Sequence, residues 1–285
     1  MIKMAGFFGL FDYTKPGKGV SKEDVDKHGI ALYFDILGRR IGKLMLLNML
    51  YVLFSIPAYV IYWFVSAYIL TLTLGGLGVE IEAAALQYIN LFMTVSLVLV
   101  LGTGSATAAM NYVLRKYVND THSWVWSDFW DEFKNSFLKG TAAFVINTVV
   151  FLLCVVAIYF YSNMTGIISV ILAAVVTVFL VLFLMMQMYV YQIMASVKLK
   201  LKDIYRNAML LTVAKLPVNI VAALAICLAI YLYNLIAANE LSLILILVIF
   251  YTLPVFTQIF ITNNTVNKYL IAPCEKAEEN VTTEE

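Results

Sequence analysis

Charged side chains are scarce in this 285-residue chain, and they are missing from its longest apolar stretches. Only 13% of the residues are Asp, Glu, Lys or Arg, whereas 62% are hydrophobic and the mean hydropathy is +0.88. A soluble domain cannot bury so much apolar surface, so the composition predicts an integral membrane protein. The formal net charge of +1 gives no general attraction to nucleic acid, and we expect no such partner.

The residue types that serve most catalytic and metal sites are also few. The two histidines, His28 and His122, lie far apart, and the three cysteines, Cys154, Cys227 and Cys274, are too scattered for a disulfide framework or a metal-binding pair. No zinc-protease, nucleotide-binding or nucleophile-elbow motif is present. We therefore predict a protein that is not an enzyme and that has no catalytic, cofactor-binding or metal-binding residues.

Six apolar runs are long enough to cross a membrane, which takes about 20 helical residues. They cover residues 44–72, 88–114, 141–161, 166–195, 217–236 and 241–263, and none contains Asp, Glu, Lys, Arg or His. The sequence thus predicts an all-α, polytopic membrane protein with six transmembrane helices in three hairpins, 44–114, 141–195 and 217–263. A cytoplasmic N-terminal arm, 1–43, precedes them, and a disordered acidic cytoplasmic tail, 264–285, follows. The uncharged interiors argue against a proton-driven pump.

The distribution of basic residues predicts the orientation of these spans. Linkers 73–87, 162–165 and 237–240 contain no Lys or Arg, whereas the other polar segments contain all 19. Acids, which do not follow the positive-inside rule, occur on both sides. Both termini are therefore expected in the cytoplasm.

A repeated stretch precedes the third and the fifth predicted spans. "DEFKNSFLKGTAAFVIN" begins at Asp131, and "DIYRNAMLLTVAKLPVN" begins at Asp203. Each carries an acid, an aromatic residue, a base and an asparagine, with a second asparagine twelve positions later. This pattern indicates that the second and third hairpins are a parallel duplication.

Each repeat predicts an amphipathic elbow helix at the cytoplasmic surface that turns into the bilayer. Aromatic residues recur at helical spacing from Trp126 to Phe137, and acid and base lie three apart in both repeats, which permits an ion pair. One interpretation is a helix that lies among the lipid headgroups. The other is a docking surface for a partner, made of Trp126, Trp130, Asp131, Phe133, Lys134, Asn135, Asp203, Arg206 and Asn207.

Amides inside the predicted spans are the remaining polar groups. Asn48, Asn147 and Asn219 are candidates for intramembrane packing through interhelical hydrogen bonds. A further set either does the same or faces a cavity for a neutral ligand: Asn111, Gln187, Gln192, Asn234 and Gln258.

Small residues are concentrated in "GTGSATAAMNY", which begins at Gly102. The spacing of four between Gly104 and Ala108, and between their neighbours, predicts a close approach of helices. A phosphate-binding loop would need a preceding strand and a lysine, and both are missing.

Several segments resemble the YesL-like membrane proteins of Gram-positive bacteria, a family of unknown function. They are "LLNMLYVLFSIP" (46–57), "GSATAAMNYVLRKYV" (104–118), "WVWSDFWDEFKNSF" (124–137) and "IYRNAMLL" (204–211). The N-terminal "FFGLFDYTKPGKGVSKE" is similar to the arm of longer members. Short members lack about forty residues that this chain carries between Pro57 and Gly104.

The resemblance implies a context and a place in the cell. Genes of this family tend to lie beside those of carbohydrate ABC importers, so we expect a multi-pass protein of the bacterial plasma membrane, an accessory or regulatory partner of importer permease subunits. The alternative is a facilitator or channel for a neutral solute. A membrane enzyme is a third hypothesis, which would need Tyr, Ser and Asn groups from separate spans to meet an acid from a loop.

Overall fold

A computed structural model describes residues 29–77, 83–236, 244, 246 and 248–273, and within these ranges the regular structure is entirely helical. The chain divides into two compact units, Met1–Arg39 and Arg40–Glu285. In the first unit, residues 29–39 are described; α1 begins there at Ile30, and Arg39 pairs with Asp35 at 2.8 Å. The site described below lies wholly in the second unit.

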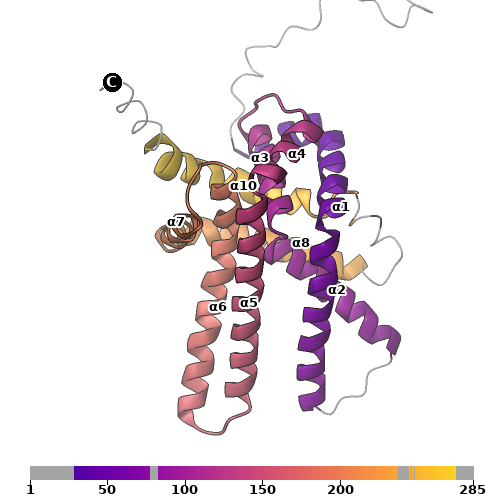
Figure 1. The fold of residues 1–285 in the computed structure, drawn as a ribbon, viewed down its shortest axis with the longest axis vertical. Coiled ribbons are helices and arrows are strands. Elements are labelled where there is room, and N and C mark those ends of the chain that lie inside the picture. Colours follow the sequence, from indigo (N-terminus) through magenta and orange to yellow (C-terminus); the bar gives the residue numbers. More distant parts are fainter. Residues whose placement is uncertain (1–28, 78–82, 237–243, 245, 247, 274–285) are drawn as a thin grey trace, which may run out of the picture. The chain divides into compact units, whose positions relative to one another are not determined.

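The helices follow one another with short connections (Figure 1). Their bounds are α1 Ile30–Leu77, α2 Ala83–Leu101, α3 Ser105–Val118, α4 Val125–Asn135, α5 Phe137–Ser162, α6 Ile167–Met194, α7 Leu201–Ala214, α8 Leu216–Ile236 and α10 Thr252–Val266. A short π-helical turn, η3 (Asn267–Ile271), follows α10.

Four helical segments are long and apolar enough to cross a membrane, which supports a membrane protein. They are Ile30–Leu74, Phe137–Ser162, Ile167–Met194 and Leu216–Tyr233. Ala85–Leu101 and Ser105–Val118 make a fifth candidate if this bent pair is one span. The layout of six spans in three hairpins is not confirmed. The start of the sixth predicted run lies partly outside the described residues, and α10, with 15 residues, is shorter than a span.

The second predicted run, 88–114, is broken where a continuous helix was expected. Gly102 and Gly104 have φ of +76° and +80°, a conformation that interrupts a right-handed helix and that glycine adopts without strain. Thr107 Oγ1 accepts a hydrogen bond from the Thr103 amide at 2.7 Å, just before α3 begins. The helix axes on the two sides differ by 61°.

Helices α5 and α6 lie side by side as a hairpin, and α8 runs across their direction in Figure 1. The tight turn between α5 and α6 includes Gly166, at φ +126°. Much of α6 between Ile167 and Val181 is exposed and apolar, as expected of a helix in contact with lipid. In contrast, α3 is buried along most of its length, because α4, α5, α6 and α10 pack around it.

Candidate functional site

The break between α2 and α3 leaves backbone carbonyl groups without helical partners, and tyrosine side chains supply them. Tyr62 donates its hydroxyl to Gly102 O at 2.8 Å, and Tyr191 donates to Leu101 O at 3.0 Å. A backbone carbonyl without a hydrogen-bond partner costs several kcal/mol in hydrocarbon. The tyrosines of α1 and α6 therefore stabilise the break.

Hydroxyl groups extend this network towards α1. Ser55 Oγ lies 2.8 Å from Thr103 Oγ1, which in turn lies 3.2 Å from Thr107 Oγ1. The Tyr51 hydroxyl is 3.4 Å from Thr107 Oγ1. The break is thus surrounded by neutral hydroxyl groups from three helical segments.

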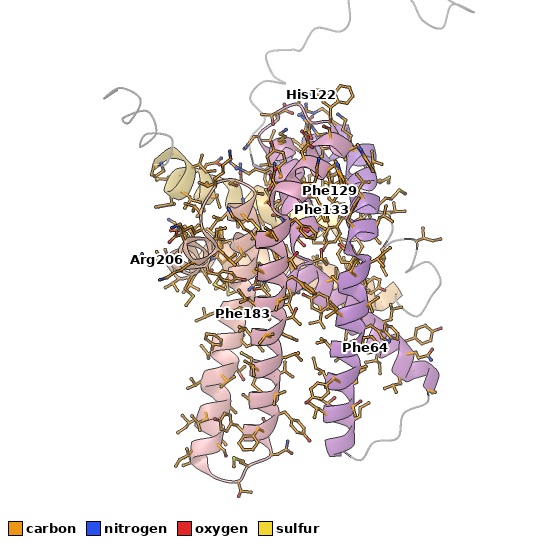
Figure 2. All side chains as sticks on the ribbon, in the orientation of Figure 1. Phe64, His122, Phe129, Phe133, Phe183 and Arg206 are labelled. Carbon is orange, nitrogen blue, oxygen red and sulfur yellow. The ribbon has the colours of Figure 1, made fainter. Side chains whose placement is uncertain are left out.

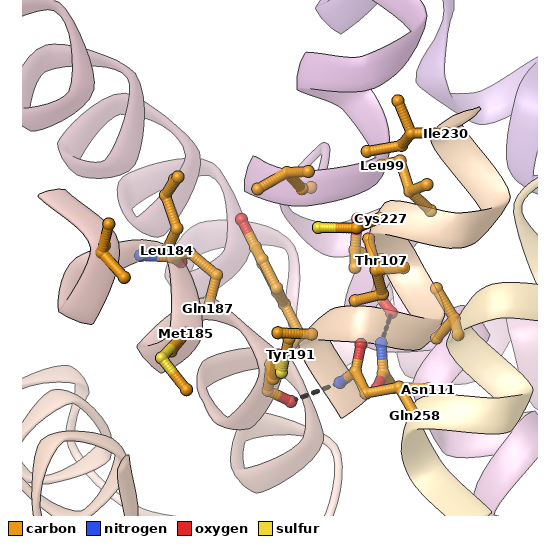
Figure 3. Close-up of a pocket in the computed structure, with 17 residues that line it drawn as sticks. Leu99, Thr107, Asn111, Leu184, Met185, Gln187, Tyr191, Cys227, Ile230 and Gln258 are labelled. Carbon is orange, nitrogen blue, oxygen red and sulfur yellow. Dashed lines mark hydrogen bonds between the residues drawn. The ribbon is translucent and has the colours of Figure 1, made fainter. Parts of the chain in front are cut away.

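A cavity of about 270 Å³ lies beside the break (Figure 3). It is bounded by α2, α3, α6, α8 and α10, and none of the described residues in its wall is charged. The lining residues are Leu99, Val100, Gly102, Thr107, Asn111, Val181, Leu184, Met185, Gln187, Met188, Tyr191, Ala223, Ile226, Cys227, Ile230, Val255 and Gln258.

Three of the amides that were possible cavity residues from the sequence line this wall: Asn111, Gln187 and Gln258. Gln192 does not line it, and its Oε1 accepts a hydrogen bond from Thr262 at 2.9 Å. The side chain of Asn234 lies outside the described part of the structure. The apolar part of the wall could not be predicted from the sequence, because Leu, Val and Met face lipid or a cavity equally well.

The cavity amides share one hydrogen-bonding pattern. Each NH₂ group donates to a backbone carbonyl, at 2.8 Å from Asn111, 3.4 Å from Gln187 and 2.7 Å from Gln258. Their side-chain oxygens accept no hydrogen bond from any described residue. The amides therefore have spare capacity at their side-chain oxygens, and each NH₂ group also keeps one of its two N–H donors.

The three asparagines predicted to act in packing are all buried, and each is hydrogen-bonded. Asn48 joins α1 to the start of α10: its Nδ2 donates to Ile246 O at 2.6 Å, and its Oδ1 accepts the amides of Tyr251 and Thr252 at 2.9 and 3.1 Å. One side chain thus satisfies three backbone groups at a helix start.

The other two asparagines bind tyrosines. Asn147 on α5 donates to the Tyr191 hydroxyl at 3.1 Å and accepts from Tyr205 of α7 at 2.6 Å. Asn219 on α8 accepts a hydrogen bond from Tyr189. Because Tyr189 of α6 binds Asn219 of α8, α6 links the predicted second and third hairpins. Tyr191 connects Asn147 to the helix break.

The first elbow, α4, packs its aromatic residues against α1. The ring of Phe54 lies 5.5 Å from that of Phe129, 5.5 Å from Trp130 and 5.0 Å from Phe133, measured between centroids (Figure 2). Trp126 is exposed, and so is Asn135. Phe129 is buried and Phe133 is half-buried, whereas Trp130 and Phe137 stay exposed like Trp126. The protein itself therefore covers only part of the predicted aromatic stripe.

The expected ion pairs differ between the two elbows. Lys134 Nζ lies 3.4 Å from Asp131 Oδ1, and both side chains are exposed. Asp203 and Arg206 of α7 form no ion pair with each other or with another described residue; Arg206 is exposed and points outward in Figure 2, and Asn207 is partly exposed. An exposed ion pair such as that of Lys134 and Asp131 adds little to the stability of the fold, about 0.5 kcal/mol.

The two repeats also bend at different positions. In the first repeat, the helix is interrupted at Ser136, between α4 and α5 and directly after the first asparagine of the repeat. In the second repeat, α7 continues past Asn207 to Ala214. Asn219 Nδ2 donates to Leu211 O at 3.3 Å and Thr212 O at 2.9 Å, and so satisfies carbonyls at the end of α7. The repeated sequence therefore does not produce the same elbow twice.

Asp128 ties α4 to α3 and makes this contact sensitive to acid. Its carboxylate lies 3.0 Å from Lys116 Nζ and accepts hydrogen bonds from the Ser123 hydroxyl and the Trp124 amide. Burial raises the pKa of Asp128, but the Ser123 and Lys116 hydrogen bonds and the Lys116 charge lower it by more, so the net pKa lies below its ordinary value.

We predict that this contact weakens in acid. A lowered pKa contributes stability that is present above the ordinary value of about 4 and is lost as the pH falls through the lower, folded-state value. Asp128→Asn should lower the free energy of unfolding at pH 7 by on the order of 1 kcal/mol, a modest amount because the Asp128–Lys116 pair is partly exposed. On acidification, the variant should lose less stability than the wild type. Thermal unfolding in mild detergent between pH 7 and pH 3 measures this; parallel pH curves for the two proteins would contradict it.

Comparison with protein families matches residues 83–158 to a family described as "Protein of unknown function, DUF624". This is the family of YesL-like proteins, so the resemblance is supported over this stretch. No curated protein and no solved structure matches. The matched stretch contains the helix break, the first elbow and most of α5, and the family's own description assigns it no function.

Proposed function

We propose that this protein is a non-enzymatic membrane protein that binds a small uncharged solute in the cavity beside the α2–α3 break. The observation that carries the proposal is a cavity of about 270 Å³. Among the described residues, its wall has no charged side chain but includes the amide oxygens of Asn111 and Gln187, which have no hydrogen-bond partner. Ligand sites in proteins are mostly apolar with a few polar groups. In many transporters they lie at interrupted membrane helices.

Ligand-dependent stability tests this function. We expect glycerol or a member of a set of uncharged mono- and disaccharides to raise the melting temperature of the purified protein, since a ligand that binds the folded state stabilises it. Ala223→Trp, which places a large ring in the cavity wall, should abolish the shift. Val221→Trp, at an exposed position of the same helix, should keep it. Equal shifts in both variants would contradict the cavity as the site.

Flux through proteoliposomes then distinguishes a facilitator from a receptor. Vesicles that contain the protein are mixed with the solute that raised the melting temperature, and stopped-flow light scattering follows their volume. If the solute crosses through the protein, it should enter these vesicles faster than vesicles without protein. A rate equal to that of empty vesicles, with the thermal shift intact, would favour a receptor.

An accessory role beside a carbohydrate importer is the second proposed function, favoured by the exposed side chains of α4 and α7. Trp126 and Arg206 are exposed on these helices and have no role in the cavity. Affinity purification from host membranes should recover permease subunits, and Lys134→Glu with Arg206→Glu should lose them at normal membrane levels. Recovery of the chain alone would contradict a stable complex.

The arrangement of the spans in the membrane is a separate proposal. We infer six spans with both termini in the cytoplasm of a bacterial plasma membrane, supported by the absence of Lys and Arg from three linkers. Cysteines introduced at 75 and 164 should react with an impermeant maleimide in whole cells, and one introduced at 200 should not.

A further inference from the structure

The cavity beside the break reaches the outer surface of the protein between α6 and α8. Val181 on α6 and Cys227 on α8 both line the cavity, and both are exposed, Val181 at 52%. A residue that is exposed and also lines a cavity marks its opening. Figure 3 shows the Cys227 side chain in the space between the two helices.

The surface around this opening is apolar. Val178 on α6 and Leu224 and Leu228 on α8 are exposed near it, at 60%, 62% and 57%. Both helices are candidate membrane spans. A surface of this kind contacts hydrocarbon, so a ligand that uses this route arrives from the bilayer and not from water.

Some polar groups of the cavity lie together, whereas Gln187 lies apart from them beside Leu184 and Met185 (Figure 3). In Figure 3, Thr107, Asn111 and Gln258 lie together at one end, whereas Leu99 and Ile230 lie at another. The Asn111 and Gln258 oxygens accept no hydrogen bond from the described residues, whereas each NH₂ group already donates one N–H to a backbone carbonyl and keeps one. A ligand that matches this wall has an apolar body and a hydrogen-bond donor at one end.

A charged headgroup does not fit the same wall. The lining, as far as the structure describes it, contains no Asp, Glu, Lys, Arg or His, and an unpaired charge in such surroundings is strongly unfavourable. The donor is therefore a neutral group, and a hydroxyl is the simplest one that both reaches an amide oxygen and dissolves in hydrocarbon.

We propose that the ligand of this cavity is an uncharged lipophilic alcohol that enters from the bilayer between α6 and α8, with its hydroxyl on the Gln258 and Asn111 oxygens. This inference rests on the proposed function, because it specifies the class of solute and its route.

Photolabelling of the wild-type protein in lipid nanodiscs tests both parts. The probes are decanol carrying a diazirine and its methyl ether, which has the same chain but no donor. We expect the alcohol to label the α6 and α8 peptides that contain Met185 and Cys227 at least several-fold more than the ether does. Excess unlabelled decanol should compete, and excess ether should not. Equal labelling by the two probes would overturn the role of the hydroxyl.

Variants locate the two ends of the ligand. Gln258→Leu should lower labelling by the alcohol towards the level of the ether, because it removes an acceptor. Cys227→Trp should block both probes at the opening, whereas Val175→Trp, at an exposed α6 position that does not line the cavity, should block neither. Labelling that survives Cys227→Trp would contradict the lateral route. The comparison of probes on the wild type needs no variant to fold.

The outcomes separate this inference from the proposed function. A saccharide that raises the melting temperature in an Ala223-dependent way, combined with equal labelling by alcohol and ether, leaves the uncharged-solute site standing and overturns the lipophilic ligand. If Ala223→Trp changes neither the melting-temperature shift caused by saccharides nor the labelling by the alcohol, both proposals are wrong.

Discussion

Gly140→Ala is expected to destabilise the protein by about 3 kcal/mol, the upper range for overpacking a core. A Cβ atom at this position of α5 would lie 2.4 Å from Ser105 N, 2.7 Å from Ser105 Cα and 2.9 Å from Gly104 C. All three are backbone atoms at the start of α3, so no side chain can rotate away to make room. The substitution must push α5 away from α3, or displace the break itself.

The damage should extend beyond one contact, because the break is held by several hydrogen bonds. Thr103 and Thr107, which bind each other's hydroxyl, flank Gly104 and Ser105, and Tyr62 and Tyr191 bind carbonyls just before them. A shift of α3 by the size of a methyl group changes the distances on which these bonds depend. We therefore expect the loss of stability to be accompanied by weaker ligand binding in the cavity.

Gly42→Ala is the matched control. Gly42 is also a helical glycine, but a Cβ atom there would meet nothing within 4 Å. In an exposed helix, alanine is more favourable than glycine by about 1 kcal/mol, so this variant should equal or exceed the wild type. Thermal unfolding in mild detergent measures both variants. A Gly140→Ala protein that melts within a few degrees of the wild type would show that α5 can move without cost.

The sequence predicts the lipid-facing helices of this protein well and its interior poorly. The apolar runs 141–161 and 166–195 correspond to α5 and α6, because a helix that faces lipid needs only apolar residues and length. The run 88–114 is also long and free of charged residues, yet it breaks at Gly102. That outcome depends on backbone angles and on the approach of Gly140 from another helix, neither of which hydropathy records.

The same reasoning explains the candidate site. Gln187 and Gln258 were expected either between helices or in a cavity. Gln258 does both, because it lines the cavity and its NH₂ group bonds to Met188 O of another helix, whereas Gln187 lines the cavity and bonds to Phe183 O within its own helix. Sequence alone cannot separate these roles, because an amide can serve them at once. The repeated sequence predicted two equivalent elbow helices, but these helices end at different positions of the repeat, at Ser136 and at Lys215.

Asn48→Leu is expected to cost about 2 to 3 kcal/mol, although it replaces a polar residue by an apolar one of similar size inside a predicted span. The fully buried amide makes three hydrogen bonds to backbone groups between Ile246 and Thr252. Interhelical bonds of this kind contribute about 0.6 kcal/mol on average in membrane proteins. Here the loss is larger, because two amide N–H groups and a carbonyl are left buried without a partner.

Asn163→Leu provides the comparison for this substitution. Its amide donates only to Tyr159 O within its own exposed turn, so its loss should change stability by less than about 0.5 kcal/mol. Unfolding of both variants in mild detergent should therefore separate a structural amide from a surface one. Asn48→Leu unfolding at the wild-type temperature would mean that the start of α10 finds other partners. The link between α1 and α10 would then rest on the Thr252 hydroxyl, which donates to Leu44 O at 3.3 Å, on the Tyr59 and Tyr251 hydroxyls, and on the packing of Tyr51 against Tyr251.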